Sequence, residues 1–140
     1  MKGGKGELMN SNKANEYYKL ALNTKDSKKR LDYLIKASNK NHKHATLLVG
    51  YAYEDGDGTS PNDELAIKYY KKAIKLNYPL GYEALGMMYQ LGNGVKQSNL
   101  TAYKYYKKAK TSMADLNMLL LETYFYDEIK NEIEDSDDND

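Results

Sequence analysis

The residues of this chain best suited to chemistry are two aspartates in the glycine-rich segment 55–59, Asp-Gly-Asp-Gly-Thr. An Asp-x-Asp-Gly-Thr spacing suits phosphoryl transfer, in which one carboxylate attacks phosphorus and the other carries the proton. Such a motif is informative only in its structural context, a loop that follows a strand of a parallel sheet. The segment is therefore a catalytic candidate only if strands surround it.

An internal repeat argues against that catalytic reading, although the spacing matches the nucleophile loop of haloacid-dehalogenase-type phosphatases. When the sequence is shifted by 36 residues, segment 55–59 aligns with segment 91–95, Leu-Gly-Asn-Gly-Val. Both acids are lost there and both glycines remain. No alternation of strand and helix patterns follows either segment. We therefore interpret 55–59 as a turn of a repeat and expect no enzymatic activity.

Metal binding is also disfavoured. His42 and His44 are the only histidines and the chain has no cysteine, whereas a structural zinc site generally uses four ligands. A calcium loop beginning at Asp55 would need a glycine and a final glutamate where the chain has Ser60 and Ala66. We expect no metal and no cofactor.

The repeat itself predicts the fold class. Shifting by 36 residues aligns 44–78 with 80–114, and a period between 20 and 50 residues is typical of a solenoid built from one supersecondary unit. The identical pairs are Gly50/Gly86, Tyr53/Tyr89, Gly56/Gly92, Gly58/Gly94, Ala66/Ala102, Lys68/Lys104, Tyr69/Tyr105, Tyr70/Tyr106, Lys71/Lys107, Lys72/Lys108 and Ala73/Ala109.

Each unit is expected to contain a helix, a turn and a second helix. The first helix has one apolar stripe with Gly50 or Gly86 beside it. A glycine inside a helix costs about 1 kcal/mol relative to alanine, so its recurrence predicts a neighbouring helix too close for a Cβ atom. The Gly-x-Gly turn ends this helix, and Ser60, followed by Pro61 and Asp63, is the expected N-cap of the second.

The same frame extends in both directions with weaker sequence signals. Tyr17, Tyr33 and Ala37 lie 36 residues before Tyr53, Tyr69 and Ala73, which indicates a degenerate first repeat. Downstream, residues 114–131 look like a single capping helix, so seven helices are expected. The predicted segments are a flexible N-terminus 1–12, a solenoid 13–131 with repeats 13–42, 43–78 and 79–113 and the cap 114–131, and an acidic disordered tail 132–140.

The segment from Leu85 to Val95, Leu-Gly-Met-Met-Tyr-Gln-Leu-Gly-Asn-Gly-Val, followed by Ala-Tyr-Lys-Tyr-Tyr-Lys-Lys-Ala at 102–109, resembles the Sel1-like repeat, a relative of the tetratricopeptide repeat. The resemblance implies an all-α fold, a right-handed α-solenoid of antiparallel helix pairs whose first helices line a concave face. It also implies a non-enzymatic adaptor that binds a peptide or a partner protein.

Transferring the concave positions of the tetratricopeptide frame to this chain gives a candidate peptide-binding face. Tyrosine and methionine suit such a face, because phenols combine contact area with a hydrogen bond and methionine repacks easily. The residues are Asn15, Tyr18, His44, Leu47, Tyr51, Glu54, Glu83, Met87, Gln90, Thr123 and Tyr126.

The alternative function is nucleic-acid binding through a lysine ridge on the second helices. All 21 Lys and Arg residues lie at or before Lys130, and six acids lie in 132–140, so the body of the chain is basic and could contact phosphates. The ridge residues are Lys68, Lys71, Lys72, Lys75, Lys104, Lys107 and Lys108. Self-association through the ends of the solenoid is a third possibility.

Localisation is expected to be intracellular and soluble. The first twelve residues lack the apolar core of a signal peptide, and no stretch approaches the length of about 18 apolar residues that a membrane span requires.

Overall fold

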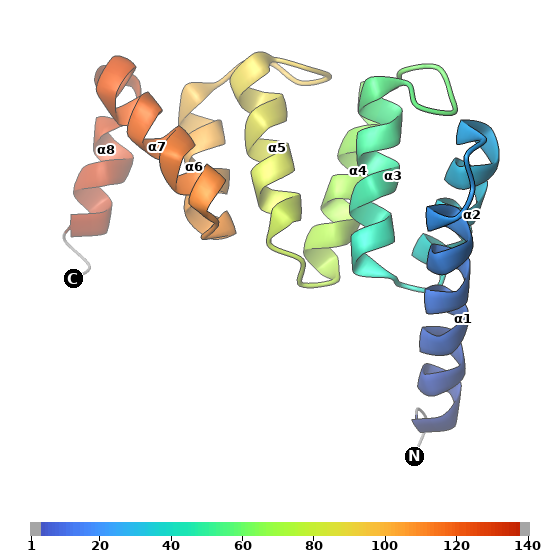
Figure 1. Ribbon diagram of the computed structural model, residues 1–140. Coiled ribbons are helices and arrows are strands. Elements are labelled where there is room, and N and C mark those ends of the chain that lie inside the picture. The colour runs from blue at the N-terminus through green and yellow to red at the C-terminus, as the bar shows by residue number, and fades with distance from the viewer. Residues whose placement is uncertain (1–3, 138–140) are drawn as a thin grey trace. The chain divides into compact units, whose positions relative to one another are not determined.

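The computed structural model describes residues 4–137 and, within them, shows eight helices and no strand (Figure 1). This confirms the all-α class predicted from the repeat. The helices are α1 Gly4–Leu22, α2 Ser27–Asn39, α3 Lys43–Asp55, α4 Asp63–Lys75, α5 Leu80–Leu91, α6 Asn99–Ala109, α7 Ser112–Tyr124 and α8 Tyr126–Asp137.

The helices form two compact units that divide after Tyr78. In the N-terminal unit each helix packs on the next, from α1 to α4. In the C-terminal unit α5 packs on α6, and α6, α7 and α8 pack on one another. The core of the N-terminal unit contains Ala21, Leu31, Leu34, Ala37, Ala45, Val49 and Ala52. The core of the C-terminal unit contains Ala102, Tyr103, Tyr106, Ala109, Ala114, Leu121 and Ile129.

The close helix approach predicted at Gly50 and Gly86 is confirmed, and the group that makes it is a tyrosine ring. A Cβ atom at Gly50 would lie 2.6 Å from Cδ1 of Tyr70, and one at Gly86 would lie 2.7 Å from Cδ1 of Tyr106. Both rings are fully buried. The same contact thus joins the first and second helix of each strong repeat.

A second pair of tyrosines also recurs between these helices. Tyr53 stacks on Tyr69 with ring centroids 5.8 Å apart, and Tyr89 stacks on Tyr105 with centroids 5.5 Å apart. Burial raises the pKa of both Tyr69 and Tyr105. The abundance of tyrosine in the repeat is therefore explained largely by packing between paired helices.

Glycines end the first helices as expected, but the caps of the second helices differ in detail. Gly56 and Gly92 are the C-caps of α3 and α5, both with φ of 73° in the left-handed region. The side chain of Asn62, not Ser60, accepts from the backbone N–H of Leu65 and caps α4. Ser60 lies two residues before this N-cap, because helix α4 begins only at Asp63.

The expected flexible N-terminus is helical from Gly4 onward. Residues 4–13 of α1 are all exposed, and Ala14 is the first buried one. These turns add no core residue, so no apolar pattern marked them as helix. Residues 1–3 lie outside the described part of the chain.

The expected single capping helix is wrong, because the C-terminal unit ends in the pair α7 and α8. Phe125 interrupts the helix with φ of −132°. Helix α8 then continues through much of the expected disordered tail to Asp137, because Ile129 is fully buried and Ile133 packs on the same core. The acids that surround these two isoleucines concealed an amphipathic pattern. Residues 138–140 of the expected tail lie outside the described residues.

Between residues 4 and 137, no helix has the length and apolar character needed to cross a membrane.

The tyrosine contacts predict the effect of adding one methyl group. We expect Gly50→Ala and Gly86→Ala each to lower the free energy of unfolding by about 1–3 kcal/mol, the usual cost of overpacking. Gly6→Ala is the control, since a Cβ there meets nothing within 4 Å and should leave stability unchanged or raise it by up to about 1 kcal/mol. Urea denaturation of the three variants measures the difference. Equal stability of Gly50→Ala and Gly6→Ala would contradict the packing role.

Candidate protein-binding surface

Two residues of the predicted peptide-binding face, Glu54 and Gln90, accept hydrogen bonds from buried tyrosines. The Tyr70 hydroxyl donates to Oε1 of Glu54 at 2.5 Å, and the Tyr106 hydroxyl donates to Oε1 of Gln90 at 2.6 Å. Glu54 and Gln90 are equivalent positions, 36 residues apart. Burial raises the pKa of both phenols, assisted by the hydrogen bond and charge of Glu54 at Tyr70 and by the charge of Glu83 at Tyr106. The side chains of Glu54 and Gln90 therefore satisfy hydroxyl groups of the buried core.

Three further residues of the predicted face also have internal roles. Leu47 has 1% of its surface exposed and belongs to the core, so its assignment to a binding face is wrong. Glu83 accepts from the hydroxyl of Thr111, the N-cap of α7, at 2.5 Å. The Thr123 hydroxyl donates to the carbonyl of Leu119 within its own helix. Sequence position alone could not separate Leu47 and Glu83 from the exposed residues.

Five residues of the predicted face are exposed to solvent: Asn15, Tyr51, Met87, Thr123 and Tyr126. The Tyr51 ring packs edge-on against Tyr70 with centroids 5.7 Å apart. It also lines a shallow cavity of about 240 Å³ in the N-terminal unit. Met87, on α5, is 42% exposed.

The remaining two predicted residues, Tyr18 and His44, form an aromatic cluster in the N-terminal unit. The Tyr18 ring lies 4.4 Å from that of His42 and 5.6 Å from that of His44, measured between centroids. Nδ1 of His44 is 2.9 Å from the Tyr78 hydroxyl and shares a hydrogen bond with it. Lys43 places its ammonium 5.8 Å from the centre of the Tyr78 ring.

A pocket of about 450 Å³ lies beside this cluster, between the first turns of α1 and the α2–α3 connection. Its lining combines polar side chains with the apolar side chain of Ala14. Its lining residues are Glu7, Asn10, Ser11, Ala14, Asn15, Lys40, Asn41, His42, Lys43 and His44. We call this the histidine pocket. Asn15 and His44 are the two predicted residues that the fold brings together here.

Sequence reasoning missed two contributors to the histidine pocket. The N-terminal turns of α1 were expected to be flexible. His42 was expected to be a surface or groove histidine and not a metal ligand, yet its Nδ1 accepts from the backbone N–H of Ala45 at 3.0 Å and caps α3. Histidine is not among the preferred N-cap residues, so no simple rule points to this role. Burial, and secondarily the charge of His44, lowers the pKa of His42.

Three lysines of the predicted ridge contact other residues of the chain. Lys72 donates to the carbonyl and hydroxyl oxygens of Ser38 at 2.6 and 3.2 Å, and burial lowers its pKa. Lys107 forms an ion pair with Glu132 at 3.4 Å, and Lys108 lies over the Tyr82 ring. The exposed members are Lys68, Lys71, Lys75, Lys104 and Lys108.

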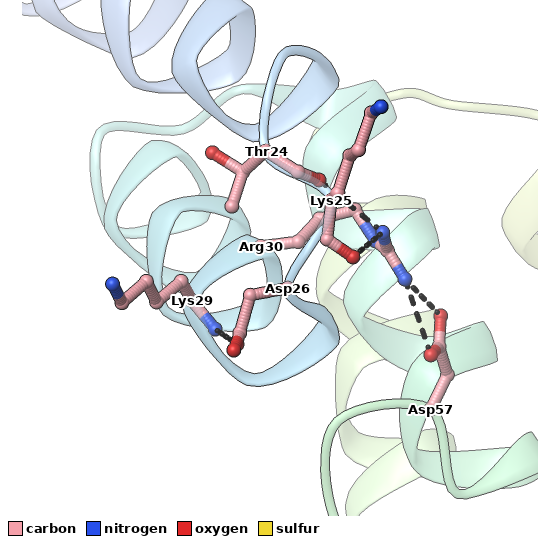
Figure 2. A network of polar contacts seen from close by, with 6 residues as sticks. All are labelled: Thr24, Lys25, Asp26, Lys29, Arg30 and Asp57. Carbon is pink, nitrogen blue, oxygen red and sulfur yellow. Dashed lines mark hydrogen bonds and ion pairs between the residues drawn. The ribbon is translucent and has the colours of Figure 1, made fainter.

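Asp55 ends helix α3, not a strand, and Asp57 lies in the turn that follows. Its position is set by Arg30, which donates to both carboxylate oxygens of Asp57 at 3.2 and 3.1 Å and to the carbonyls of Thr24 and Lys25 (Figure 2). Asp57 thus ties the glycine turn to the start of α2. Among the described residues, no group of three or more His, Cys, Asp or Glu could hold a metal ion.

With this geometry established, the chain can be compared with known proteins. The Sel1 repeat model matches residues 2–23, 43–78 and 79–111, together more than half of the chain. The chain belongs to the Sel1 repeat family. The second and third matches coincide closely with the repeats predicted from the 36-residue period. A comparison with curated proteins yields no match.

Solved Sel1 repeat structures share the fold. A Sel1 repeat protein from Oxalobacter formigenes is 28% identical with a TM-score of 0.66, and the match covers 69% of this chain and 41% of that one. Cysteine rich protein B from Helicobacter pylori is 26% identical with a TM-score of 0.60, and the match covers 78% and 94%.

A protective antigen of uropathogenic Escherichia coli strains, described as displaying an SLR fold, supports the fold alone. It is 22% identical with a TM-score of 0.67, and the match covers 84% of this chain and 26% of that one. This Sel1 repeat chain thus spans less than half the length of the Oxalobacter and Escherichia proteins.

Tyr70 and Tyr106 allow a test of whether a hydrogen bond to a charged acceptor stabilises the repeat more than one to a neutral acceptor. We expect Tyr70→Phe to cost about 1.5–3 kcal/mol of unfolding free energy, because it removes a hydrogen bond to the charged Glu54, and Tyr106→Phe, which loses a bond to neutral Gln90, to cost about 0.5–1.5 kcal/mol. Thermal and urea denaturation check the order. A larger loss for Tyr106→Phe would contradict the assignment.

His42 predicts a pH dependence of stability. Its folded-state pKa is lowered from 6.5, so its stabilising contribution is complete above pH 6.5 and is lost as the pH falls from 6.5 through the lowered value. We expect the unfolding free energy to decrease on acidification from about pH 7.5 to about pH 5.5. His42→Asn retains a capping side chain without titrating, so its curve should be flatter. Parallel curves for both proteins would refute the role of His42.

Proposed function

We propose that this Sel1 repeat chain is a non-enzymatic adaptor that binds an extended segment of a partner protein on the face of the N-terminal unit that carries the histidine pocket and Tyr51. The observation that carries the proposal is the pocket itself, which places Asn15 and His44 beside the polar side chains of Asn10, Ser11 and Asn41 in a cavity of about 450 Å³. Pockets of this volume with a few convergent polar groups suit ligand binding.

The arrangement of α3 extends this face along the helix. His44 and Tyr51 are seven residues apart, which is about two turns, so they lie on one side of α3. A bound segment could place a polar group among the asparagines and histidines and an apolar side chain against Tyr51. Aromatic residues of this kind are frequent anchors at interfaces.

The alternative, nucleic-acid binding, has a weaker basis. Three of the seven ridge lysines, Lys72, Lys107 and Lys108, contact other parts of the chain. The exposed Lys68, Lys71 and Lys75 share one depression on α4 with Glu64, whose negative charge works against a phosphate there.

A peptide-display selection on the immobilised chain tests the adaptor proposal. We expect the selected peptides to bind His44→Ala and Tyr51→Ala at least about five-fold more weakly, the effect of losing an interface contact worth about 1 kcal/mol. Fluorescence anisotropy measures the affinities, and Lys104→Ala, an exposed change in the C-terminal unit, should bind normally.

Two results would redirect the proposal. Equal binding of the peptides to wild type and to both α3 variants would exclude this face. Tight binding of a single-stranded RNA, steeply weakened by salt and lost in a Lys68→Glu/Lys71→Glu/Lys75→Glu variant, would favour the nucleic-acid alternative.

A further inference from the structure

The C-terminal unit has an unusual concentration of exposed apolar side chains. Seven of the fourteen exposed large hydrophobic residues in the described chain lie between Met113 and Tyr126. Five of them are on α7 itself and are 43–73% exposed: Met113, Leu116, Leu119, Leu120 and Tyr124. We call these five residues the α7 face. Contiguous exposed apolar surface of this kind marks an interaction site.

Helical spacing shows that the α7 face is distinct from the side of α7 that packs in the core. Ala114 and Leu121 are fully buried in the C-terminal core, whereas Met113, Leu116, Leu120 and Tyr124 recur every three or four residues along a different side. Helix α7 is therefore apolar on two sides. Exposed apolar surface of this extent marks an interaction site, so the α7 face is expected to be covered.

An acidic helix borders the α7 face. Helix α8 packs on α7 and contains six acids and one lysine, a net charge of −5. Two copies of the α7 face packed on each other would bring two such helices close together. Like charges disfavour that arrangement, so the partner surface should combine apolar and basic groups.

The outer side of α1 has this combination. Ala14 and Ala21 mark the buried side of α1. Leu8, Met9 and Leu20 are 41–61% exposed on other sides of the helix. Lys5, Lys13 and Lys19 are exposed between them, and the acids of this stretch are Glu7, which lines the histidine pocket, and Glu16. We call Lys5, Leu8, Met9, Lys13, Lys19 and Leu20 the α1 face.

We propose that the α7 face of one copy of this chain docks on the α1 face of a second copy, with the acids of α8 next to the lysines of α1. The contact joins two different surfaces, so the pair retains one unused α1 face and one unused α7 face and can add a further copy. A first helix placed against the last helix pair also continues the stacking by which solenoid repeats bury their apolar faces. Neither face shares a residue with the histidine pocket, although α1 also contributes to that pocket.

The test uses two variants that each disable one face. Leu116→Glu/Leu120→Glu alters the α7 face, and Lys5→Glu/Lys13→Glu/Lys19→Glu alters the α1 face. All five positions are exposed, so both proteins should fold, which circular dichroism checks. Tyr124→Lys, at a residue 73% exposed, is a milder second variant of the α7 face. Sedimentation velocity gives the mass of each protein over a range of concentrations and salt.

We expect the mass of the wild type to rise with concentration and to fall at high salt. Each variant alone should weaken association at least ten-fold. An equimolar mixture of the two should form a complex of two chains and no larger species, because the mixture has one intact α7 face and one intact α1 face. The control variant Lys68→Glu/Lys71→Glu/Lys75→Glu changes the net charge by the same amount as the α1-face variant. It should associate like the wild type.

Three results would overturn the proposal. The first is a wild type that stays monomeric at all concentrations. The second is association that is lost in the α7-face variants but unchanged in the α1-face variant, which would indicate contact between two α7 faces or with another partner. The third is a mixture in which the two variants remain monomeric.

Discussion

The contact between a tyrosine ring and a helical glycine determines how the strong repeats are built. The Tyr70 ring lies where a Cβ of Gly50 would be, and its hydroxyl reaches Glu54, one turn further along α3. The ring needs the space that glycine leaves, and its buried hydroxyl needs an acceptor. Gly86, Tyr106 and Gln90 repeat the arrangement in the next repeat. The separation of the paired helices follows from this one contact.

The same contact limits which residues remain for recognition. Glu54 and Gln90 lie on helices that would line a concave face, but their acceptor atoms complete the buried phenols. The residues that remain for binding a partner are therefore those that do not pack in the core, such as Asn15 and Met87. The exposed apolar side chains of α7 are the main exception, since they occupy a large surface without a partner among the described residues.

Equivalent repeat positions do not imply equivalent roles. Lys36, Lys72 and Lys108 are 36 residues apart, yet Lys36 lies over the rings of Tyr17 and Tyr33, Lys72 donates to Ser38, and Lys108 lies over Tyr82. A period in the sequence predicts where a side chain leaves the backbone. Its partner depends on the side chains nearby, which differ between repeats: Lys72 reaches the preceding repeat, whereas Lys36 and Lys108 contact tyrosines of their own repeats.

By itself, the sequence determined the helical class, the 36-residue unit, the glycine turns and the close approach at Gly50, because these depend on local conformation and spacing. The tertiary structure decided the rest. Ile129 and Ile133 make α8 a packed helix although acids surround them, and His42 caps α3 only because the chain reverses before it. The packing of α8 depends on contacts with segments distant in sequence, which leave no local pattern. The bond of His42 to Ala45 is local, but histidine is not a preferred N-cap residue, so its type did not indicate the cap.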